Sequence, residues 1–238
     1  IQVRFGDFEA LHNINVDVRE GEFFTFLGPS GCGKTTTLRT ITGFIDPVSG
    51  PVRVKDRDIT HVPIEDRNIG IVFQSYALFP TMTVYDNIAY GDPEATREDV
   101  VRAAKLAGAH EFISELKNGY DTYVGERGVK LSGGQKRRAA IPGVIAMEPD
   151  VLIPDEPTAG LDPAGRESIL ENIRAYQAAQ HAAVVMVSHS MEEIASNVDR
   201  LIVMEKGTAV MNGAPSEVFS HAAELVAMGL NVPCMTQV

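Results

Sequence analysis

The sequence lacks any apolar run long enough to cross a bilayer, and it has few cysteines. A membrane-spanning helix needs roughly 18 consecutive apolar residues, and no run approaches that length. No secretory signal stands at the start, and the chain begins with Ile1 rather than Met, which indicates a trimmed sequence. The two cysteines, Cys32 and Cys234, do not look like a disulfide framework, so a reducing, cytosolic setting is expected.

Clustered positive charge is also scarce. The formal net charge is −11, and the only dense basic cluster is Lys136-Arg137-Arg138. A surface that binds nucleic acid needs many grouped Lys and Arg side chains to neutralise phosphates. We therefore expect no nucleic-acid partner. With 238 residues, 44% of them hydrophobic, the chain is long enough to bury a core in one or two domains.

Apolar strand-like runs alternate with helical periodicity along most of the chain, which predicts an α/β fold with a mainly parallel sheet. Short strands joined by turns at the start predict an antiparallel β section near the N-terminus. We expect one domain over 1–238, with a core from 1–74 and 143–238 and an inserted helical subdomain at 75–142. The expected strands are Ile1–Phe5, Ile14–Val18, Phe23–Leu27, Val52–Val54, Ile69–Phe73, Val151–Ile153 and Ala183–Ser188, with a hairpin at Leu201–Val210. The expected helices cover Glu94–Leu116, Ser132–Met147, Pro163–Ala179 and Glu192–Asn197, and Gly119–Val129 is expected to be a loop.

Residues 28–35 fit the phosphate-binding pattern G-x-x-x-x-G-K-[ST] at every fixed position. The pattern follows an apolar strand and opens a helical stretch, the context in which such a loop binds phosphate. Glycines let backbone N–H groups converge on an anion, and the helix start adds the positive end of its dipole. Lys34 would reach the β- and γ-phosphates, and the Thr35 hydroxyl would bind Mg²⁺. The alternative is a glycine-rich turn that starts a helix without a ligand. The candidate residues are Gly28, Pro29, Ser30, Gly31, Cys32, Gly33, Lys34, Thr35 and Thr36.

Three further segments carry candidate chemistry. Leu131-Ser132-Gly133-Gly134-Gln135 stands at an expected helix start, where it would make a second anion cradle or a simple helix cap. The apolar strand at 151–153 leads to Asp155 and Glu156, which would hold Mg²⁺ and polarise an attacking water, or merely cap the next element. His189 ends another apolar strand, at the edge where α/β sheets bind ligands, although a lone histidine is more often structural.

In this order and spacing, these motifs resemble those of the ATP-binding subunit of ABC transporters over nearly the whole chain. The resemblance implies a P-loop NTPase core that binds ATP and Mg²⁺. Residues 28–35 match Walker A, 131–135 match the family signature, and Val151–Asp155 with Glu156 match Walker B and the catalytic glutamate. The remaining matches are Phe5 with the aromatic that stacks on adenine, Gln74 with the glutamine that meets Mg²⁺, Asp162 with the loop that crosses the dimer interface, and His189 with the switch histidine. An aromatic in a first strand is more often core, which is the alternative for Phe5.

The resemblance also implies partners and a location. Two subunits would form a head-to-tail homodimer in which each ATP lies between Walker A of one and Ser132-Gly133-Gly134 of the other. ATP binding would close the dimer, and hydrolysis would reopen it, driving integral-membrane transporter subunits through a population shift. The catalytic set is then Lys34, Gln74, Glu156 and His189, and the metal set Thr35, Gln74 and Asp155. The protein is expected to be cytoplasmic and peripheral on the inner face of the cell membrane.

Two prolines and an uneven resemblance depart from the family pattern. Pro154 lies in the Walker B strand and Pro142 inside the helix after the signature, where proline removes a hydrogen-bond donor. The alternatives are a strand that ends early and a tolerated kink. Residues 1–91 resemble importer ATPases, 119–128 exporters, and the chain from Lys136 the energy-coupling-factor type, so we hypothesise a chimera. An engineered domain that binds ATP with impaired catalysis, or a soluble ABC-type ATPase, are the competing functions.

Overall fold

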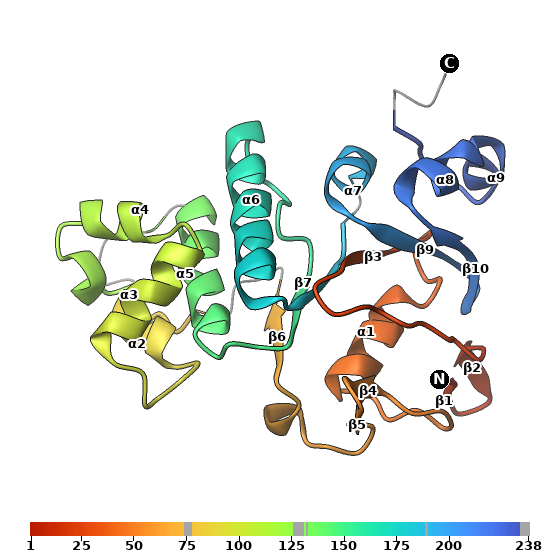
Figure 1. Ribbon diagram of the computed structural model, residues 1–238, viewed down its shortest axis with the longest axis horizontal. Helices are drawn as coiled ribbons and strands as arrows, with labels where there is room; N and C mark the ends of the chain where they lie inside the picture. Colours follow the sequence, from red (N-terminus) through yellow and green to blue (C-terminus); the bar gives the residue numbers. More distant parts are fainter. Residues whose placement is uncertain (74–77, 126–130, 132, 189, 234–238) are drawn as a thin grey trace. The chain divides into compact units, whose positions relative to one another are not determined.

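The computed structural model describes residues 1–73, 78–125, 131, 133–188 and 190–233. These residues form two compact units. Figure 1 colours the chain along its sequence, so the residues of each unit can be found from the colour bar. The first unit comprises Ile1–Ile69 and Ala183–Val238, and the second Gly70–Ala182. The fold is mixed α/β, with a mainly parallel central sheet and small antiparallel sheets near the N-terminus, which confirms the predicted fold class.

The sheet of the first unit is built around β3 (Phe23–Leu27), whose five residues are all buried. This strand pairs in parallel with β8 (Ala183–Met186) and with β9 (Arg200–Glu205). The antiparallel β10 (Thr208–Gly213) follows at the edge. The prediction that Phe23–Leu27 belongs to an antiparallel section is therefore wrong. Both of its partners come from the other end of the chain, and a strand buried on both faces is typical of parallel pairing.

Two small antiparallel pairs precede and follow the first helix. The pair β1 (Val3–Phe5) and β2 (Phe8–Leu11) places Phe5 opposite Phe8. The predicted strand Ile14–Val18 is wrong, because the chain already reverses at Gly6, whose φ is 60°, and residues 14–18 are irregular. The second pair consists of β4 (Arg53–Val54) and β5 (Arg57–Asp58).

The helices of this unit are mostly short. The ribbon in Figure 1 shows α8 and α9 following β10 at the C-terminal end of the unit, and neither helix was predicted. The helix α7 confirms the one expected at Glu192–Asn197, and Ser190 caps it by accepting a hydrogen bond from the Glu193 N–H. The bounds are Lys34–Thr42 for α1, Ile64–Asp66 for a short 3₁₀ helix, Met191–Asn197 for α7, Pro215–Ser220 for α8 and Ala222–Ala227 for α9.

The second unit contains two neighbouring strands and most of the longer helices. The strand β6 (Ile69–Val72) begins at the unit boundary, and β7 (Val151–Pro154) lies beside it, with the Asp155 N–H 2.9 Å from the Val72 carbonyl oxygen. Pro154 is thus part of the strand, so the strand does not end early. The helices are α2 (Val84–Ala89), α3 (Arg97–Leu106), α4 (His110–Glu115), α5 (Gly133–Ile145) and α6 (Pro163–Gln180), with a 3₁₀ turn at Gly119–Asp121.

The predicted helix Glu94–Leu116 is divided into α3 and α4 at Gly108. This residue has a φ of 60°, and a Cβ there would lie 2.2 Å from Nδ2 of Asn172, so only glycine fits the break. Side-chain caps mark several helix starts, as at Thr96, which exchanges hydrogen bonds with Asp99 in a capping box. Local capping signals therefore place these helix starts.

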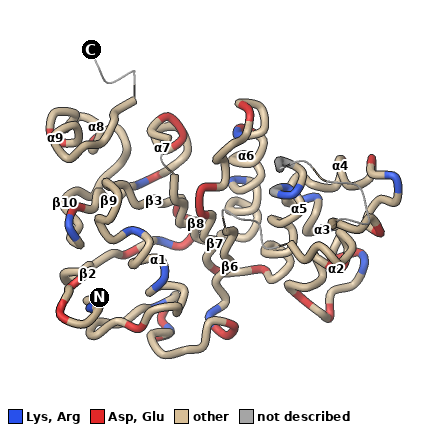
Figure 2. Tube along the Cα trace, turned by 180° about the vertical axis from the view of Figure 1, so that it is seen from behind, with Lys and Arg blue, Asp and Glu red and all other residues tan. Residues whose placement is uncertain are grey.

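The helix α5 packs tightly against the end of α2 and carries Pro142 in its interior. A Cβ added to Gly91 would lie 2.0 Å from the carbonyl oxygen of Gly143, so the two backbones touch. The expected helical subdomain, residues 75–142, lies inside the second unit, and its status as a separate insert stays a prediction. Lys and Arg are interspersed with Asp and Glu along both units (Figure 2). Within the described residues, no helix is both long and apolar enough to cross a membrane.

Candidate functional site

The glycine-rich loop between β3 and α1 is held in a shape that larger residues would disrupt. A Cβ on Gly28 would lie 2.3 Å from the carbonyl oxygen of Met204 and 2.5 Å from Sγ of Cys32. A Cβ on Gly33, whose φ is 109°, would lie 2.7 Å from Cδ2 of Leu11. The loop thus packs directly on neighbouring strands, and its glycines are required by close approach as well as by backbone conformation.

Lys34 is buried and folds back into this loop. Its ammonium donates to the carbonyl oxygens of Gly28, at 2.5 Å, and Pro29, at 3.1 Å, and lies 3.6 Å from Sγ of Cys32. A buried ammonium whose described hydrogen-bond partners are neutral groups is costly unless an anion approaches it. The loop therefore holds one fixed positive charge at its centre.

The start of α1 adds backbone donors to this charge. Gly33 occupies the N-cap position and has no side chain, so it offers no side-chain oxygen to accept a hydrogen bond from the first-turn N–H groups. Thr35 is exposed and Thr36 half-buried at the same turn. A cation, a set of backbone donors and the positive end of a helix dipole together make a site for a phosphate group. This observation fits an anionic nucleotide better than it fits a plain turn.

The second unit presents two acidic side chains directly after β7. The hydrogen bond from the Asp155 N–H to Val72 keeps Asp155 in line with the strand. Glu156 has a φ of 52°, a left-handed conformation that is uncommon for residues other than glycine. Such strain persists only where the surroundings impose it, and it is frequent at functional sites. Carboxylate and hydroxyl oxygens are ligands that Mg²⁺ prefers, so Asp155 and Thr35 fit this metal chemically. Among the described residues, no group of three or more His, Cys, Asp or Glu could hold a metal alone.

Asp162 lies at the start of α6 and caps it. Its Oδ1 accepts a hydrogen bond from the Gly165 N–H at 2.8 Å, and Pro163 occupies the first turn, as is common for proline. Beside this cap lies a cavity of about 490 Å³, lined by Arg138, residues 160–162 and the first two turns of α6. Arg138 also stands 4.9 Å above the ring of Phe112. Arg138 is not among the predicted site residues, although the basic cluster at 136–138 was an available signal.

The structure describes only some of the remaining predicted site residues. Gln74, Ser132 and His189 lie outside the described residues, and Gly133, Gly134 and Gln135 are in the first turn of α5. Phe5, on β1, has 51% of its surface exposed, so the alternative that this aromatic is a core residue is wrong. Its contact with adenine stays a prediction.

Ser188 and Glu193 form a buried polar contact that sequence reasoning missed. The Ser188 hydroxyl donates to Oε2 of Glu193 at 3.0 Å and accepts from the Ser190 N–H at 3.1 Å. Ser188 and Ser190 flank position 189 in the sequence, and the acidic pair at 192–193 in the first turn of α7 was the available signal. The predicted site residues are thus gathered in two places. The phosphate loop and Phe5 belong to the first unit, and Asp155, Glu156 and Asp162 belong to the second.

The fold and the loop define a phosphate-loop nucleotide-binding protein, and comparisons with known proteins narrow this class. A family model described as ABC transporter matches residues 11–159. The energy-coupling factor transporter ATP-binding protein EcfA2 of Clostridium tetani is 38% identical over 240 residues, covering 96% of this chain and 80% of the relative. The chain therefore belongs to the ABC transporter family, as an ATP-binding domain.

Two other relatives and one solved structure agree with this assignment. The spermidine/putrescine import ATP-binding protein PotA of Mesoplasma florum is 39% identical, and the alignment covers 91% of this chain and 60% of PotA. The sulfate/thiosulfate import ATP-binding protein CysA 2 of Chromobacterium violaceum is 42% identical, with 94% and 60% covered. A bacterial Atm1-family ABC exporter with ATP bound superposes with a TM-score of 0.82 at 36% identity, covering 94% of this chain and 39% of that chain.

These findings confirm the predicted family. They also confirm the prediction that the domain binds and hydrolyses ATP to power a membrane transporter. Subunits of this kind work with membrane transporter subunits. Each kind of relative matches nearly the whole chain, so the matches do not divide the chain into segments. They give no support to the chimera, which stays a hypothesis.

Proposed function

We propose that this chain binds Mg²⁺–ATP through the residues that its motifs single out. The observation that carries the proposal is the Lys34 ammonium, which the loop holds at the start of α1. Lys34 would exchange its carbonyl contacts for the β- and γ-phosphates, and the backbone N–H groups of residues 30–36 would surround the same oxygens. Thr35, Gln74 and Asp155 would hold Mg²⁺, which would neutralise phosphate charge when bound. The exposed ring of Phe5 would stack on the adenine.

For hydrolysis, we propose Glu156 as the general base. Its strained backbone, directly after the aligned Asp155, supports a fixed carboxylate position at the strand end. Glu156 would accept a proton from the attacking water while Lys34 holds the γ-phosphate, and His189 would contact the same phosphate. Replacing Glu156 with Gln keeps the shape and removes the base, so ATP binding should persist while phosphate release stops.

The phosphate loop is tested most directly through its lysine. Lys34→Ala should weaken ATP binding at least tenfold, because it removes the only side-chain charge that the loop offers to the β- and γ-phosphates. Lys206→Ala is the matched control, since its side chain is 88% exposed and the same charge is removed. Equilibrium titration with labelled ATP would measure both variants. Unchanged affinity in Lys34→Ala would refute the assignment of the loop.

We also propose that two copies close head to tail over two ATP molecules, so that Ser132, Gly133, Gly134, Gln135 and Asp162 serve the nucleotide of the partner copy. One chain carries two sequence motifs of a kind that can bind an anion, which supports sharing between copies. Gly134→Asp should permit ATP binding but block closure, because a carboxylate would face the γ-phosphate. Mixing Gly134→Asp with Lys34→Ala protein leaves one intact site in each heterodimer, so some turnover should return. Heterodimers that form without any turnover would contradict the shared site.

We further propose that the chain acts on the cytoplasmic face of the cell membrane as a peripheral subunit of an uptake system. The curated relatives include two that are named as import ATP-binding proteins, which supports uptake over export. Co-expression with candidate integral-membrane subunits, followed by detergent co-purification, tests the partner. Stable capture by subunits of exporters, but not by those of importers, would overturn the proposed direction.

A further inference from the structure

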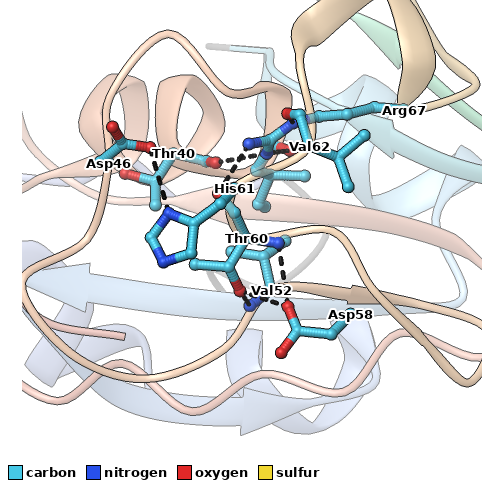
Figure 3. Close-up of polar contacts among 9 residues, drawn as sticks. Thr40, Asp46, Val52, Asp58, Thr60, His61, Val62 and Arg67 are labelled. Carbon is cyan, nitrogen blue, oxygen red and sulfur yellow. Dashed lines mark hydrogen bonds and ion pairs between the residues drawn. The ribbon is translucent and has the colours of Figure 1, made fainter.

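Arg67 is a buried cation whose described hydrogen bonds all go to backbone carbonyls (Figure 3). Its Nη1 donates to the carbonyl oxygens of Thr40 and Ile41, at 3.2 and 2.8 Å. Its Nε donates to Val62 at 2.8 Å, and its Nη2 to Thr60 at 2.9 Å. One side chain thus joins the last turn of α1 to the turn formed by residues 60–62, with only 3% of its surface exposed.

The turn at 60–62 is itself held in place. Oδ1 of Asp58 accepts from both the N–H and the hydroxyl of Thr60, at 2.9 and 2.6 Å. The hydroxyl of Thr60 in turn accepts from the Val52 N–H at 2.8 Å. Figure 3 shows Nδ1 of His61 directed at Oδ1 of Asp46, 4.0 Å away. Arg67 therefore connects α1 to a turn that has its own supports.

The helix α1 needs such support because its sequence is a weak helix former. It has nine residues, whereas isolated helices in water are marginal below about 12–15. β-Branched side chains reduce helix propensity, and threonine hydroxyls here bond back to the helix carbonyls of Gly33, Thr36 and Leu38. Six of the nine residues are β-branched, namely Thr35, Thr36, Thr37, Thr40, Ile41 and Thr42.

The end of the helix is shaped around the guanidinium. Gly43 ends α1 with a φ of 90°, and a Cβ there would lie 2.5 Å from Nε and 2.6 Å from Cζ of Arg67. Burial lowers the pKa of Arg67, and the charge of Asp46 acts in the opposite direction. Arginine nevertheless stays protonated at neutral pH, because its pKa lies far above neutrality. A fixed positive charge at the last carbonyls also matches the negative end of the helix dipole.

We propose that Arg67 is a positioning residue for the phosphate loop. It holds the C-terminal end of α1, so that the N-terminal turn and Lys34 meet the phosphates in the required place. A helix of nine residues is about 13 Å long and moves as a rod, so a tilt at one end displaces the other. Binding sites tolerate about 0.5 Å of such displacement. The inference rests on the proposed function of this loop.

The test replaces Arg67 and measures phosphate binding well below the melting temperature. Arg67→Met keeps an unbranched apolar stem and removes every donor. It should weaken ATP and ADP binding about tenfold, a typical effect of losing a supporting residue behind a binding site. Arg67→Lys can restore some of the carbonyl contacts, so its dissociation constant should lie between those of the parent and of Arg67→Met. Arg57→Met is the control, because it removes an exposed arginine from β5.

A purely structural role would lower the melting temperature of Arg67→Met and leave the ATP dissociation constant of the folded protein unchanged. That result would overturn the proposal. If Arg67→Met does not fold, Arg67→Lys decides the question. An affinity at least threefold weaker than that of the parent would support the proposal, and the parental affinity would refute it. Amide hydrogen exchange in residues 34–37 of the ligand-free protein provides a second measurement, and faster exchange in the Arg67 variants is expected.

Lys34→Ala, measured in the same series, separates this inference from the function on which it rests. If Lys34→Ala loses ATP binding while both Arg67 variants keep it, the loop binds phosphate and only the role of Arg67 is wrong. If Lys34→Ala binds ATP like the parent, the proposed function of the loop fails first.

Discussion

Replacing Pro142 with Ala should raise the free energy of unfolding by about 1 kcal/mol. Proline inside a helix is about 3 kcal/mol less favourable than alanine, because it removes one hydrogen bond and its ring clashes with the preceding turn. Here the missing N–H belongs to the helix bond that the Arg138 carbonyl would accept within α5. Two terms reduce the gain. Pro142 is buried, so the two lost methylenes remove up to about 1.6 kcal/mol, and the freer unfolded chain removes about 0.4–1 kcal/mol.

For a chain of this size, such a gain raises the melting temperature by about 2–4 °C. Circular dichroism melts and urea titrations of Pro142→Ala and the parent would measure it. Pro215→Ala is the control, because Pro215 occupies the first turn of α8, where proline fits, and its replacement should lower the melting temperature slightly. A lower melting temperature for Pro142→Ala would refute the reasoning. The close contact of Gly143 with the end of α2 would then depend on the proline beside it.

Three further changes test other parts of the structure. Pro154→Leu should raise both the melting temperature and ATP turnover, because leucine restores an N–H on the edge of β7 that faces away from β6. Thermal melts and steady-state phosphate release would measure the two effects, and a decrease in both would contradict the prediction. Glu22→Gln should cost about 3–5 kcal/mol at pH 7, since Arg200 bonds both oxygens of this buried carboxylate, at 2.7 and 2.9 Å. Burial raises the pKa of Glu22, but the Arg200 hydrogen bond and charge outweigh it, so the folded pKa lies below 4.5. The stabilisation is present above pH 4.5 and is lost as the pH falls through the folded pKa, and urea titrations across this range should show a smaller acid dependence in Glu22→Gln. Gly28→Ala should abolish ATP binding, because its methyl group would overlap the Met204 carbonyl, and parental affinity in a titration would contradict the described loop.

Much of the candidate site was predictable because its signals are local. The strand at Phe23–Leu27, the loop after it and the helix from Lys34 follow one another directly in the chain. The predicted start of α6 agrees with the structure, because Asp162 caps the helix and Pro163 occupies its first position. Its predicted end is one residue short of the observed one. By contrast, β2 was missed because a two-residue turn at Gly6 reverses the chain early, and α8 and α9 were missed because six-residue helices carry little periodicity.

By itself, the sequence determined the strand, loop and helix of the phosphate-binding segment, the helices α6 and α7 and the family, because glycine spacing, caps and apolar runs act over a few neighbouring residues. Only the tertiary structure decided which strands pair and what supports the loop. The parallel pairing of Phe23 with Val184 joins distant parts of the chain, and no local pattern records such a partner. Arg67 reads in the sequence as an ordinary surface charge, yet it is buried against Thr40, 27 positions away. Its place follows from the backbone carbonyls that the fold gathers around it, since a buried cation is stable only where such acceptors meet.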